Sequence, residues 1–385
     1  MAVLHICSDF ARQNIYCHLL AALAARGLSQ VAFAPVRTEG EVGLGPELEH
    51  RSRSPVVLRK VLTPLDRILF RRKIRRVMHT LEAAVNLGHI HLVHAHFWYS
   101  DGAVARKLRE RYGLPFVVAV RNTDVNAFLR LRPDLLGLAT EVLLAAARIV
   151  FITPCYVERV LSKLGKQARL QVEGKICVVP NGVAAFWLEG DLALPPEAAT
   201  VPPETLRVLY VGDFSSNKNL KNLVKAVEIL NRSRPVRLTL IGSGGAYEGW
   251  VGTRAGAEDG LVTWKGRLSD TAALRREYLQ HHVFAMPSLR ETFGVVYLEA
   301  LSQGLPILHS RGEGIDGYFD GLDIAEKANP NSPQEIAEKL RILSERTPGV
   351  RVRCRQAARR FDWNVVAAQY QEIYDAAILK GNQRG

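Results

Sequence analysis

The chain has 385 residues, of which 48% are hydrophobic and 23% charged, so it is a globular protein that can bury cores of normal size and is long enough for two domains. No run approaches the eighteen or so apolar residues that span a bilayer, and the first ten residues do not suggest a secretory signal. The net charge of +13 is concentrated at 51–54, 58–60, 70–76 and 351–360, which indicates either an anionic partner or solvated basic helix faces.

The five cysteines are odd in number and form no C-x-x-C pair. This pattern is typical of reduced, packed cysteines in a cytosolic protein rather than of a disulfide framework or a zinc site.

Strands and helices alternate along the first half of the chain. Short apolar runs predict strands at 2–8, 29–36, 90–97, 114–122 and 148–154, and helical spacing predicts helices at 14–27, 101–113 and 135–147. Such alternation predicts a parallel sheet covered on both faces.

The alternation pauses after residue 183 and restarts at residue 206. Strands are expected at 206–214, 236–245, 283–288 and 305–310, helices at 219–233 and 271–282, and an amphipathic helix at 363–381. We therefore predict two Rossmann-like, doubly wound α/β domains that face a cleft. The predicted parts are an acceptor domain at 1–183, a linker at 184–205, a donor domain at 206–360, and a C-terminal segment at 361–385 that packs back on the first domain.

Two glutamates lie eight positions apart in the stretch RETFGVVYLEALSQGLP. Glu291 is expected in a loop after a strand, and Glu299 on the helix that follows. The amides from Thr292 to Val295 would form the first turn of that helix, and helix N-termini attract phosphate. A carboxylate, a phosphate cradle and a second carboxylate match the order of groups in a nucleotide sugar, although Glu299 could instead pair with an arginine at a domain surface.

Several ordered motifs together resemble the retaining glycosyltransferases of family 4, which have the GT-B fold. They are PSLRETFGVVYLEALSQGLPIL, VLYVGDFSSNKNLKNLVKAVEIL, LTLIGSGG, VTWKGRLSD, VVPNGV, VHAHFWYSDGAVARKL and PFVVAVRNTDV. The resemblance extends over nearly the whole chain and is strongest from 206 to 306.

The resemblance implies that a sugar moves from a nucleotide diphosphate donor to an acceptor hydroxyl with its anomeric configuration kept. It implies no metal, no other cofactor and no protein nucleophile, with Lys218 and the helix N-terminus holding the leaving diphosphate. A UDP-sugar is favoured as the donor, with a GDP-sugar as the alternative. The expected donor-binding residues are Gly212, Asp213, Asn217, Lys218, Ser243, Arg267, Ser288, Glu291, Thr292, Phe293, Gly294, Val295 and Glu299.

The sequence departs from the family pattern at two points. Asp213 stands where the family usually has an arginine, and Arg121 stands where its first domain often has a histidine. We hypothesise that Arg121, oriented by Asp213, supplies the second positive charge when the domains close, so that Glu291, Lys218 and Arg121 carry the reaction. Arg121 could equally bind an anionic acceptor or form a structural pair, and the lost arginine could mark an inactive homologue.

The acceptor is expected on the first domain. The residues assigned to this side are Ser8, Asp9, Phe10, Arg12, His96, Asn122 and Asp124. His94 is expected to be structural, and the loop with Glu313 and Gly314 either approaches the donor sugar or is a flexible surface loop. The strings around Asp9 and Arg121 resemble a subgroup from bacterial surface-polysaccharide assembly, which implies a saccharide or lipid-linked saccharide acceptor.

The segment 59–79 mixes apolar residues with many arginines. It could lie on an anionic membrane face or be a solvated basic helix. We expect a cytoplasmic protein, with peripheral contact to the inner face of the plasma membrane left open. Other GT-B reactions, such as a nucleotide-sugar epimerase or a phosphorylase, and a non-catalytic role in a polysaccharide complex are the alternatives. No nucleic-acid-binding motif accompanies the charge, so nucleic acid is not an expected partner.

Overall fold

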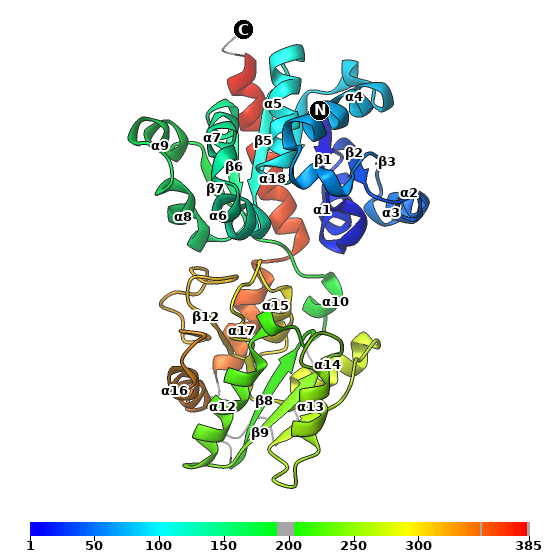
Figure 1. The fold of residues 1–385 in the computed structure, drawn as a ribbon. Coiled ribbons are helices and arrows are strands. Elements are labelled where there is room, and N and C mark those ends of the chain that lie inside the picture. Colours follow the sequence, from blue (N-terminus) through cyan, green and yellow to red (C-terminus); the bar gives the residue numbers. More distant parts are fainter. Residues whose placement is uncertain (191–203, 347–348, 383–385) are drawn as a thin grey trace. The chain divides into compact units, whose positions relative to one another are not determined.

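The computed structural model describes residues 1–190, 204–346 and 349–382, which form two compact units. Unit 1 contains Met1–Ile152, Tyr156–Gly182 and the C-terminal helix that begins at Trp363, and unit 2 contains Thr153–Cys155 and Val183–Asp362 (Figure 1). Of the expected linker, residues 191–203 lie outside the described residues, whereas 185–188 form a short helix with a buried Trp187.

Unit 1 is built on a seven-stranded parallel sheet with the order β3-β2-β1-β4-β5-β6-β7. Its strands are β1 (Ala2–Ile6), β2 (Ser29–Val36), β3 (Val56–Lys60), β4 (Leu92–Ala95), β5 (Phe116–Val120), β6 (Arg148–Phe151) and β7 (Ile176–Val178). Its α-helices are α1 (Asn14–Ala25), α2 (Glu39–Val42), α3 (Gly45–Ser52), α4 (Phe70–Ala84), α5 (Ser100–Tyr112), α6 (Leu129–Leu131), α7 (Leu136–Ala145), α8 (Val157–Leu161), α9 (Lys166–Glu173) and α18 (Trp363–Asn382). Its shorter helical turns are η1 (Phe10–Arg12), η2 (Pro64–Arg67), η3 (Leu87–His89), η4 (Thr123–Phe128) and η5 (Pro133–Leu135), while η6 (Pro154–Tyr156) lies where the two units divide.

Both faces of this sheet are buried, as the continuous apolar runs predict. Val117 of β5 packs in a core with α1 and α18, whereas the next residue, Val118, faces α5 and α7 beside Gly102. Figure 1 shows α18, in red, lying among the blue to green elements of unit 1. Its Trp363 and Tyr374 belong to that same core, so the end of the chain completes the first unit.

Unit 2 is built on a six-stranded parallel sheet with the order β10-β9-β8-β11-β12-β13. Its strands are β8 (Leu206–Val211), β9 (Val236–Ile241), β10 (Val262–Trp264), β11 (Val283–Ala285), β12 (Ile307–Ser310) and β13 (Ala325–Ala328). Its helices are α10 (Ala185–Leu188), η7 (Ser216–Lys218), α12 (Leu220–Asn231), α13 (Glu248–Ala255), α14 (Thr271–Gln280), α15 (Val295–Ser302), α16 (Pro333–Ser344) and α17 (Val350–Arg359).

Each sheet starts in its middle, runs out to one edge, and then returns to continue toward the other edge. The direction changes between β1 and β4 in unit 1 and between β8 and β11 in unit 2. Ligands of doubly wound sheets bind outside the carboxyl ends of the strands at such a point. The predicted fold class is confirmed for both sheets, and the Lys218 loop after β8 and the Glu291 loop after β11 flank the second switch point.

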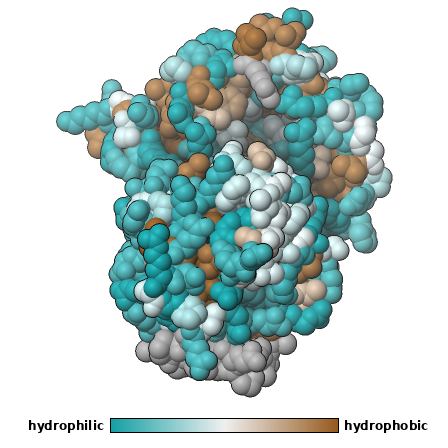
Figure 2. Space-filling view, turned by 60° about the horizontal axis from the view of Figure 1, so that its bottom comes forward, coloured by the Kyte–Doolittle hydropathy of each residue, from teal (hydrophilic) through white to brown (hydrophobic). Residues whose placement is uncertain are grey.

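The basic segment 59–79 is not a single helix. Lys60 ends β3, Pro64 begins η2, and α4 starts only at Phe70. Proline restricts the residue before it to extended backbone, which explains the break. None of the helices in the described part of the chain is long and apolar enough to cross a membrane. Figure 2 shows a face that is mostly hydrophilic, with hydrophobic residues in scattered small patches.

Candidate active site

The Lys218 loop follows β8 and is held by its neighbours in unit 2. Gly242, at the end of β9, has φ +145°, and a Cβ there would lie 1.8 Å from the carbonyl oxygen of Gly212. Only glycine therefore lets the β8 and β9 loops meet this closely. Asn219, at φ 59°, donates to the carbonyl oxygens of Pro287 and Pro330 at 2.9 and 2.7 Å, which ties the loop to the segments that follow β11 and β13.

The structure brings Lys218 and Glu291 together. The Lys218 ammonium lies 2.7 Å from Glu291 Oε2, and both side chains are largely buried. The other Glu291 oxygen, Oε1, accepts a hydrogen bond from the amide of Thr292 at 2.9 Å, and the Ser288 hydroxyl donates to Oε2 at 3.4 Å. Asn217 donates to the carbonyl oxygen of Arg290 at 2.7 Å. An ammonium group and a carboxylate are thus fixed beside the N-terminus of α15.

The N-terminus of α15 offers unpaired backbone donors. Gly294 has φ +77°, and a Cβ there would lie 2.4 Å from the ring of Tyr297. The Tyr297 hydroxyl in turn donates to the carbonyl oxygen of Met286 at 2.5 Å. Among the described residues, the amides of Phe293, Gly294 and Val295 have no protein acceptor. Free amides and the helix dipole make this turn suitable for an anion.

Glu299 has a partner, but not the arginine considered from the sequence. The Tyr278 hydroxyl donates to Glu299 Oε2 at 3.1 Å. Burial raises the pKa of Glu299 from its usual 4.5 to about 7, against the smaller opposing effect of this hydrogen bond. A carboxylate with so little compensation is suited to accept further hydrogen bonds from a ligand.

The loop containing Glu313 and Gly314 is buried rather than a flexible surface loop. Glu313 Oε2 accepts a hydrogen bond from the amide of Glu291 at 3.2 Å, and the amide of Gly314 donates to the Glu291 carbonyl oxygen at 3.1 Å. Gly314 has φ +59°, and a Cβ there would lie 2.9 Å from the Glu291 side chain. This loop positions Glu291 from the side of β12, a contact that sequence spacing did not reveal.

The remaining donor-side residues lie on the same edge of unit 2. Asp213 accepts a hydrogen bond from the amide of Ser215 at 2.8 Å. Burial acts to raise the pKa of Asp213, but the hydrogen bonds from Ser215 outweigh it and lower the pKa. Its carboxylate is therefore engaged within its own loop. Ser243 lies in the turn after β9, and Arg267 is exposed after β10.

Arg121 directly follows β5 of unit 1 and is 4% exposed. Its Nε donates to the carbonyl oxygen of His96 at 3.0 Å, its Nη1 to Asn181 Oδ1 at 3.4 Å, and the guanidinium lies 5.0 Å from the Tyr16 ring centroid. In the described part of the chain it forms no ion pair with a carboxylate. A buried guanidinium without such an ion pair is suited to bind an anionic group.

Asp124 acts on the backbone around Arg121. Its carboxylate accepts hydrogen bonds from the amides of Trp98, Tyr99 and Arg121 at 3.0–3.1 Å. Burial raises the pKa of Asp124 to about 6, and these three hydrogen bonds oppose that rise. Because they occupy its oxygens, Asp124 positions the ends of β4 and β5 rather than standing free for an acceptor. The nearby Asn122 accepts from Asn126 at 3.2 Å.

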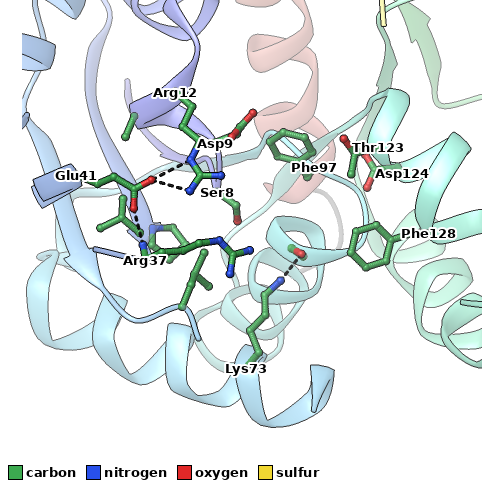
Figure 3. A pocket seen from close by; sticks show the side chains of 15 residues that line it. Ser8, Asp9, Arg12, Arg37, Glu41, Lys73, Phe97, Thr123, Asp124 and Phe128 are labelled. Carbon is green, nitrogen blue, oxygen red and sulfur yellow. Dashed lines mark hydrogen bonds and ion pairs between the residues drawn. The ribbon is translucent and has the colours of Figure 1, made fainter. Parts of the chain in front are cut away.

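A cavity of about 210 Å³ lies at the carboxyl ends of the unit 1 strands (Figure 3). Ser8, Asp9, Arg12 and Asp124 of the expected acceptor residues line it. Phe10 does not, because it is 1% exposed and packs in the core with Tyr16. Lys73 and Arg37 also line the cavity, and neither was expected there from the sequence.

His96 does not line this cavity. Its fully buried ring belongs to a group with His5 and His94, whose ring nitrogens lie close enough to consider a metal. The ring nitrogens of His5 are already engaged with His96 and Gln30, each at 3.1 Å, and His94 Nδ1 lies 2.7 Å from the Tyr374 hydroxyl. The three rings therefore form a hydrogen-bonded imidazole cluster that joins β1, β4 and α18.

Two family models match the chain, one for each unit. Residues 12–185 match the model described as Glycosyltransferase Family 4, and residues 196–361 match Glycosyl transferases group 1. The chain is a family 4, group 1 glycosyltransferase with the GT-B fold. This confirms that it is an enzyme and agrees with the resemblance drawn from its motifs.

A curated relative is similar to the enzyme over most of its length, and solved structures share its fold. The enzyme is 24% identical to a D-inositol 3-phosphate glycosyltransferase of Paenarthrobacter aurescens, over 96% of this chain and 94% of that protein. It resembles the structure of a sucrose-phosphate synthase from Thermosynechococcus elongatus, with a TM-score of 0.70 and 20% identity over 99% and 100% of the two chains. It also resembles Anabaena HepE in complex with UDP, with a TM-score of 0.67 and 16% identity over 97% and 99%.

Proposed function

We propose that this glycosyltransferase is a retaining enzyme that transfers a sugar from a nucleotide diphosphate sugar, with UDP favoured over GDP, to a saccharide or lipid-linked saccharide. The observation that carries the donor assignment is the Lys218–Glu291 pair beside the unpaired amides of α15. The amides and the ammonium group would bind the diphosphate, and Glu291 and Glu299 would accept hydrogen bonds from sugar and ribose hydroxyls, respectively.

In this proposal, Lys218 and the amides of α15 stabilise the leaving group, and no side chain attacks the sugar. As the glycosidic bond to the diphosphate breaks, negative charge grows on the departing phosphate, where Lys218 and the amides of α15 are already oriented. Glu291 holds the Lys218 ammonium in place from 2.7 Å until the donor arrives. We assign no protein nucleophile. Since these groups supply the charge compensation, we propose that the reaction needs no metal.

Donor binding and turnover by Lys218→Ala and Glu291→Gln test this proposal. We expect UDP affinity to fall by about tenfold or more for Lys218→Ala, because a buried charged contact to the diphosphate is lost. Lys225→Ala, which removes an exposed lysine of α12, is the matched control and should bind UDP normally. Turnover of a UDP-sugar should persist in EDTA. Unchanged catalysis in the Lys218→Ala, Glu291→Gln double variant would exclude the proposed site.

We further propose that Arg121 binds an anionic group of the donor or acceptor. Its guanidinium is buried and faces a carbonyl oxygen, an amide and a tyrosine ring. Arg121→Ala should reduce transfer about tenfold or more, and Arg121→Lys should restore only part of it because lysine cannot present the planar fork. Near-normal transfer by Arg121→Ala would leave Arg121 with a structural role only.

A third proposal is contact with an anionic bilayer. Leu65, Ile68 and Leu69 are 62%, 75% and 42% exposed, and they precede the exposed Arg71 and Arg72 at the start of α4. Apolar side chains beside cationic ones suit an anionic lipid surface. Sedimentation with vesicles containing phosphatidylglycerol should capture the protein at low salt, and Ile68→Asn should weaken capture. Equal capture by pure phosphatidylcholine vesicles would contradict the proposed attraction between the arginines and anionic lipids.

A further inference from the structure

The cavity of unit 1 is lined by two cations, Arg37 and Lys73, that form no ion pair with any acidic side chain of the described residues. Lys73 is 9% exposed, and its ammonium group donates to the Ser100 hydroxyl at 2.6 Å. Arg37 lines the same cavity. Within the described ranges, neither side chain forms an ion pair, and Figure 3 shows both reaching toward the middle of the cavity.

The carboxylates around this cavity have other partners. Glu41 pairs with Arg12 at 2.8 Å, and Asp66 pairs with Arg76 at 2.7 Å. Asp124 accepts the three amides described above, and Asp9 accepts from Gln13 at 2.5 Å. Glu41 also accepts from the backbone amide of Arg37 at 2.8 Å, and Asp101 accepts from the amide and hydroxyl of Ser8. The lining therefore contains acids, but in the described part of the chain none of them forms an ion pair with the side chain of Arg37 or Lys73.

Placing a buried lysine beside an arginine is unfavourable without an anion. Burial lowers the pKa of Lys73 despite the opposing charges of Asp101 and Asp66, and the smaller effect of Arg37 adds to the lowering. An ammonium group has three donors, and one hydroxyl partner satisfies only one of them. An anion between the two side chains would supply the missing acceptors and remove the repulsion.

A second cavity of about 510 Å³ shares part of this wall. Arg37, Leu62, Lys73, Thr123 and Phe128 line both cavities. The apolar side chains Ala127 and Leu131 add to the second one. The two cations thus lie where a polar cavity meets a more apolar one. A ligand held at this junction would place an anionic group on the cations and an organic group against Leu62 and Phe128.

We propose that the acceptor carries a phosphate group, which binds between Arg37 and Lys73 with its organic part directed into the neighbouring cavity. The inference rests on the proposed transferase function and names the chemical class of its acceptor. The Ser100 and Thr123 hydroxyls line the polar cavity and add neutral donors for phosphate oxygens, whereas the Ser8 hydroxyl already donates to Asp101. The same phosphate chemistry could come from a soluble sugar phosphate or from a phosphorylated lipid.

The test measures binding of three probes to the full chain at constant ionic strength. The probes are inorganic phosphate, D-inositol 3-phosphate and decyl phosphate below its micelle concentration. Chloride is the control for non-specific anion binding, and decanol is the uncharged control for decyl phosphate. Thermal shift and calorimetry should show phosphate binding that chloride does not reproduce. Tighter binding of the inositol ester than of decyl phosphate would identify a soluble source, and the reverse order a lipid source.

Lys73→Met and Arg37→Gln are the informative variants. Lys73→Met keeps the buried hydrocarbon stem, and Arg37 is exposed, so Arg37→Gln should fold even if the first variant does not. Each should weaken binding of the phosphate probes about 10- to 100-fold. Lys163→Gln, which changes an exposed lysine of the same unit, should bind them as the wild type does.

Donor binding separates this inference from the proposed function. UDP binding should be unchanged in Lys73→Met and Arg37→Gln, because the donor residues belong to unit 2. Wild-type protein that binds UDP but binds phosphate no better than chloride would overturn the phosphate site alone. Retention of wild-type phosphate affinity by the Arg37→Gln, Lys73→Met double variant would also overturn it. Failure of the wild type to bind UDP would instead count against the proposed donor site.

Discussion

Replacing Glu299 with glutamine should make unit 2 more stable at neutral pH while weakening donor binding. Burial raises the pKa of Glu299 from 4.5 to about 7, so the folded protein keeps a proton that the unfolded chain has already released. The contribution of the Glu299 side chain to the stability of unit 2 therefore falls as the pH rises from about 4.5 to about 7. At about 1.4 kcal/mol per pKa unit, the loss at pH 8 is about 3 kcal/mol, which Glu299→Gln would largely recover because glutamine does not ionise.

Thermal unfolding at pH 5 and pH 8 measures this effect. At pH 8 the transition of unit 2 should rise by several degrees in Glu299→Gln, since about 1 kcal/mol shifts Tm by about 2–4 °C in a unit of this size. At pH 5 the difference should shrink to about 1 kcal/mol, because the carboxyl group is then protonated in the folded protein and only partly ionised in the unfolded chain. Glutamine can still accept from the Tyr278 hydroxyl, so the contact at 3.1 Å is not the source of the change. Glu258→Gln, at an exposed glutamate of the same unit, is the control.

Donor binding gives the second half of the measurement. Hydrogen bonds from ligand hydroxyls favour the ionised carboxylate, so wild-type UDP affinity should increase as the pH rises through about 7. Glu299→Gln should bind UDP more weakly and lose this pH dependence. An equal Tm change at both pH values, or a less stable variant at pH 8, would refute the assignment of an uncompensated buried carboxylate at Glu299.

Three further changes test other parts of the structure. Gly294→Ala should weaken UDP binding about tenfold or more and destabilise unit 2 by about 1–3 kcal/mol, because a Cβ would lie 2.4 Å from the Tyr297 ring. In the control variant Gly249→Ala the new Cβ meets nothing within 4 Å, so UDP affinity and the stability of unit 2 should both stay unchanged in the same titration. Trp363→Ala should destabilise unit 1 by about 3–5 kcal/mol in thermal unfolding but leave UDP binding intact, because Trp363 packs in the core of that unit. Burial lowers the pKa of His5 to about 3 and lowers that of His94 as well, so the unfolded chain binds more protons below about pH 6.5 and acid destabilises unit 1. Below about pH 6.5, His94→Gln should reduce the slope of the unfolding free energy against pH by about 1.4 kcal/mol per pH unit. Urea titrations at several pH values measure this slope, and an unchanged slope would contradict the prediction.

The buried strands could be predicted because each is a short apolar run. The predicted strand at 206–214 corresponds to β8 (Leu206–Val211), and that at 29–36 to β2 (Ser29–Val36). β13 (Ala325–Ala328) was missed because its sequence, AEKA, is only partly buried at the sheet edge. β3 was hidden in the basic segment, where Arg59 and Lys60 are exposed at its end. Edge strands have weaker apolar patterns than central ones, so a sequence reading finds the middle of a sheet first.

The donor side of the candidate site was also foreseeable in outline, because the motifs around Lys218 and Glu291 resemble the donor segments of the family and Glu291 follows a predicted strand. Its supports were not foreseeable. Asn219 holds the Lys218 loop through two carbonyl oxygens, and Gly314 packs against Glu291. Both contacts join segments far apart in the chain, and neither residue type indicates its distant partner. The order of predicted strands and helices indicates which strand ends share an edge of the sheet. It does not indicate which loops contact each other across that edge.

Lys73 shows where a closer sequence reading would have succeeded. The segment was treated as a basic clump, yet Phe70, Ile74, Val77 and Leu81 form the buried face of α4, and Lys73 lies on that same face. Residues three and four positions apart share one side of a helix. A lysine in such a register must bury its stem, and its ammonium group then needs an acceptor. The neighbouring Arg71 and Arg72, which are exposed, carry no such requirement. Helical register, rather than local charge density, therefore distinguishes Lys73 from its exposed neighbours as a residue of the proposed anion site.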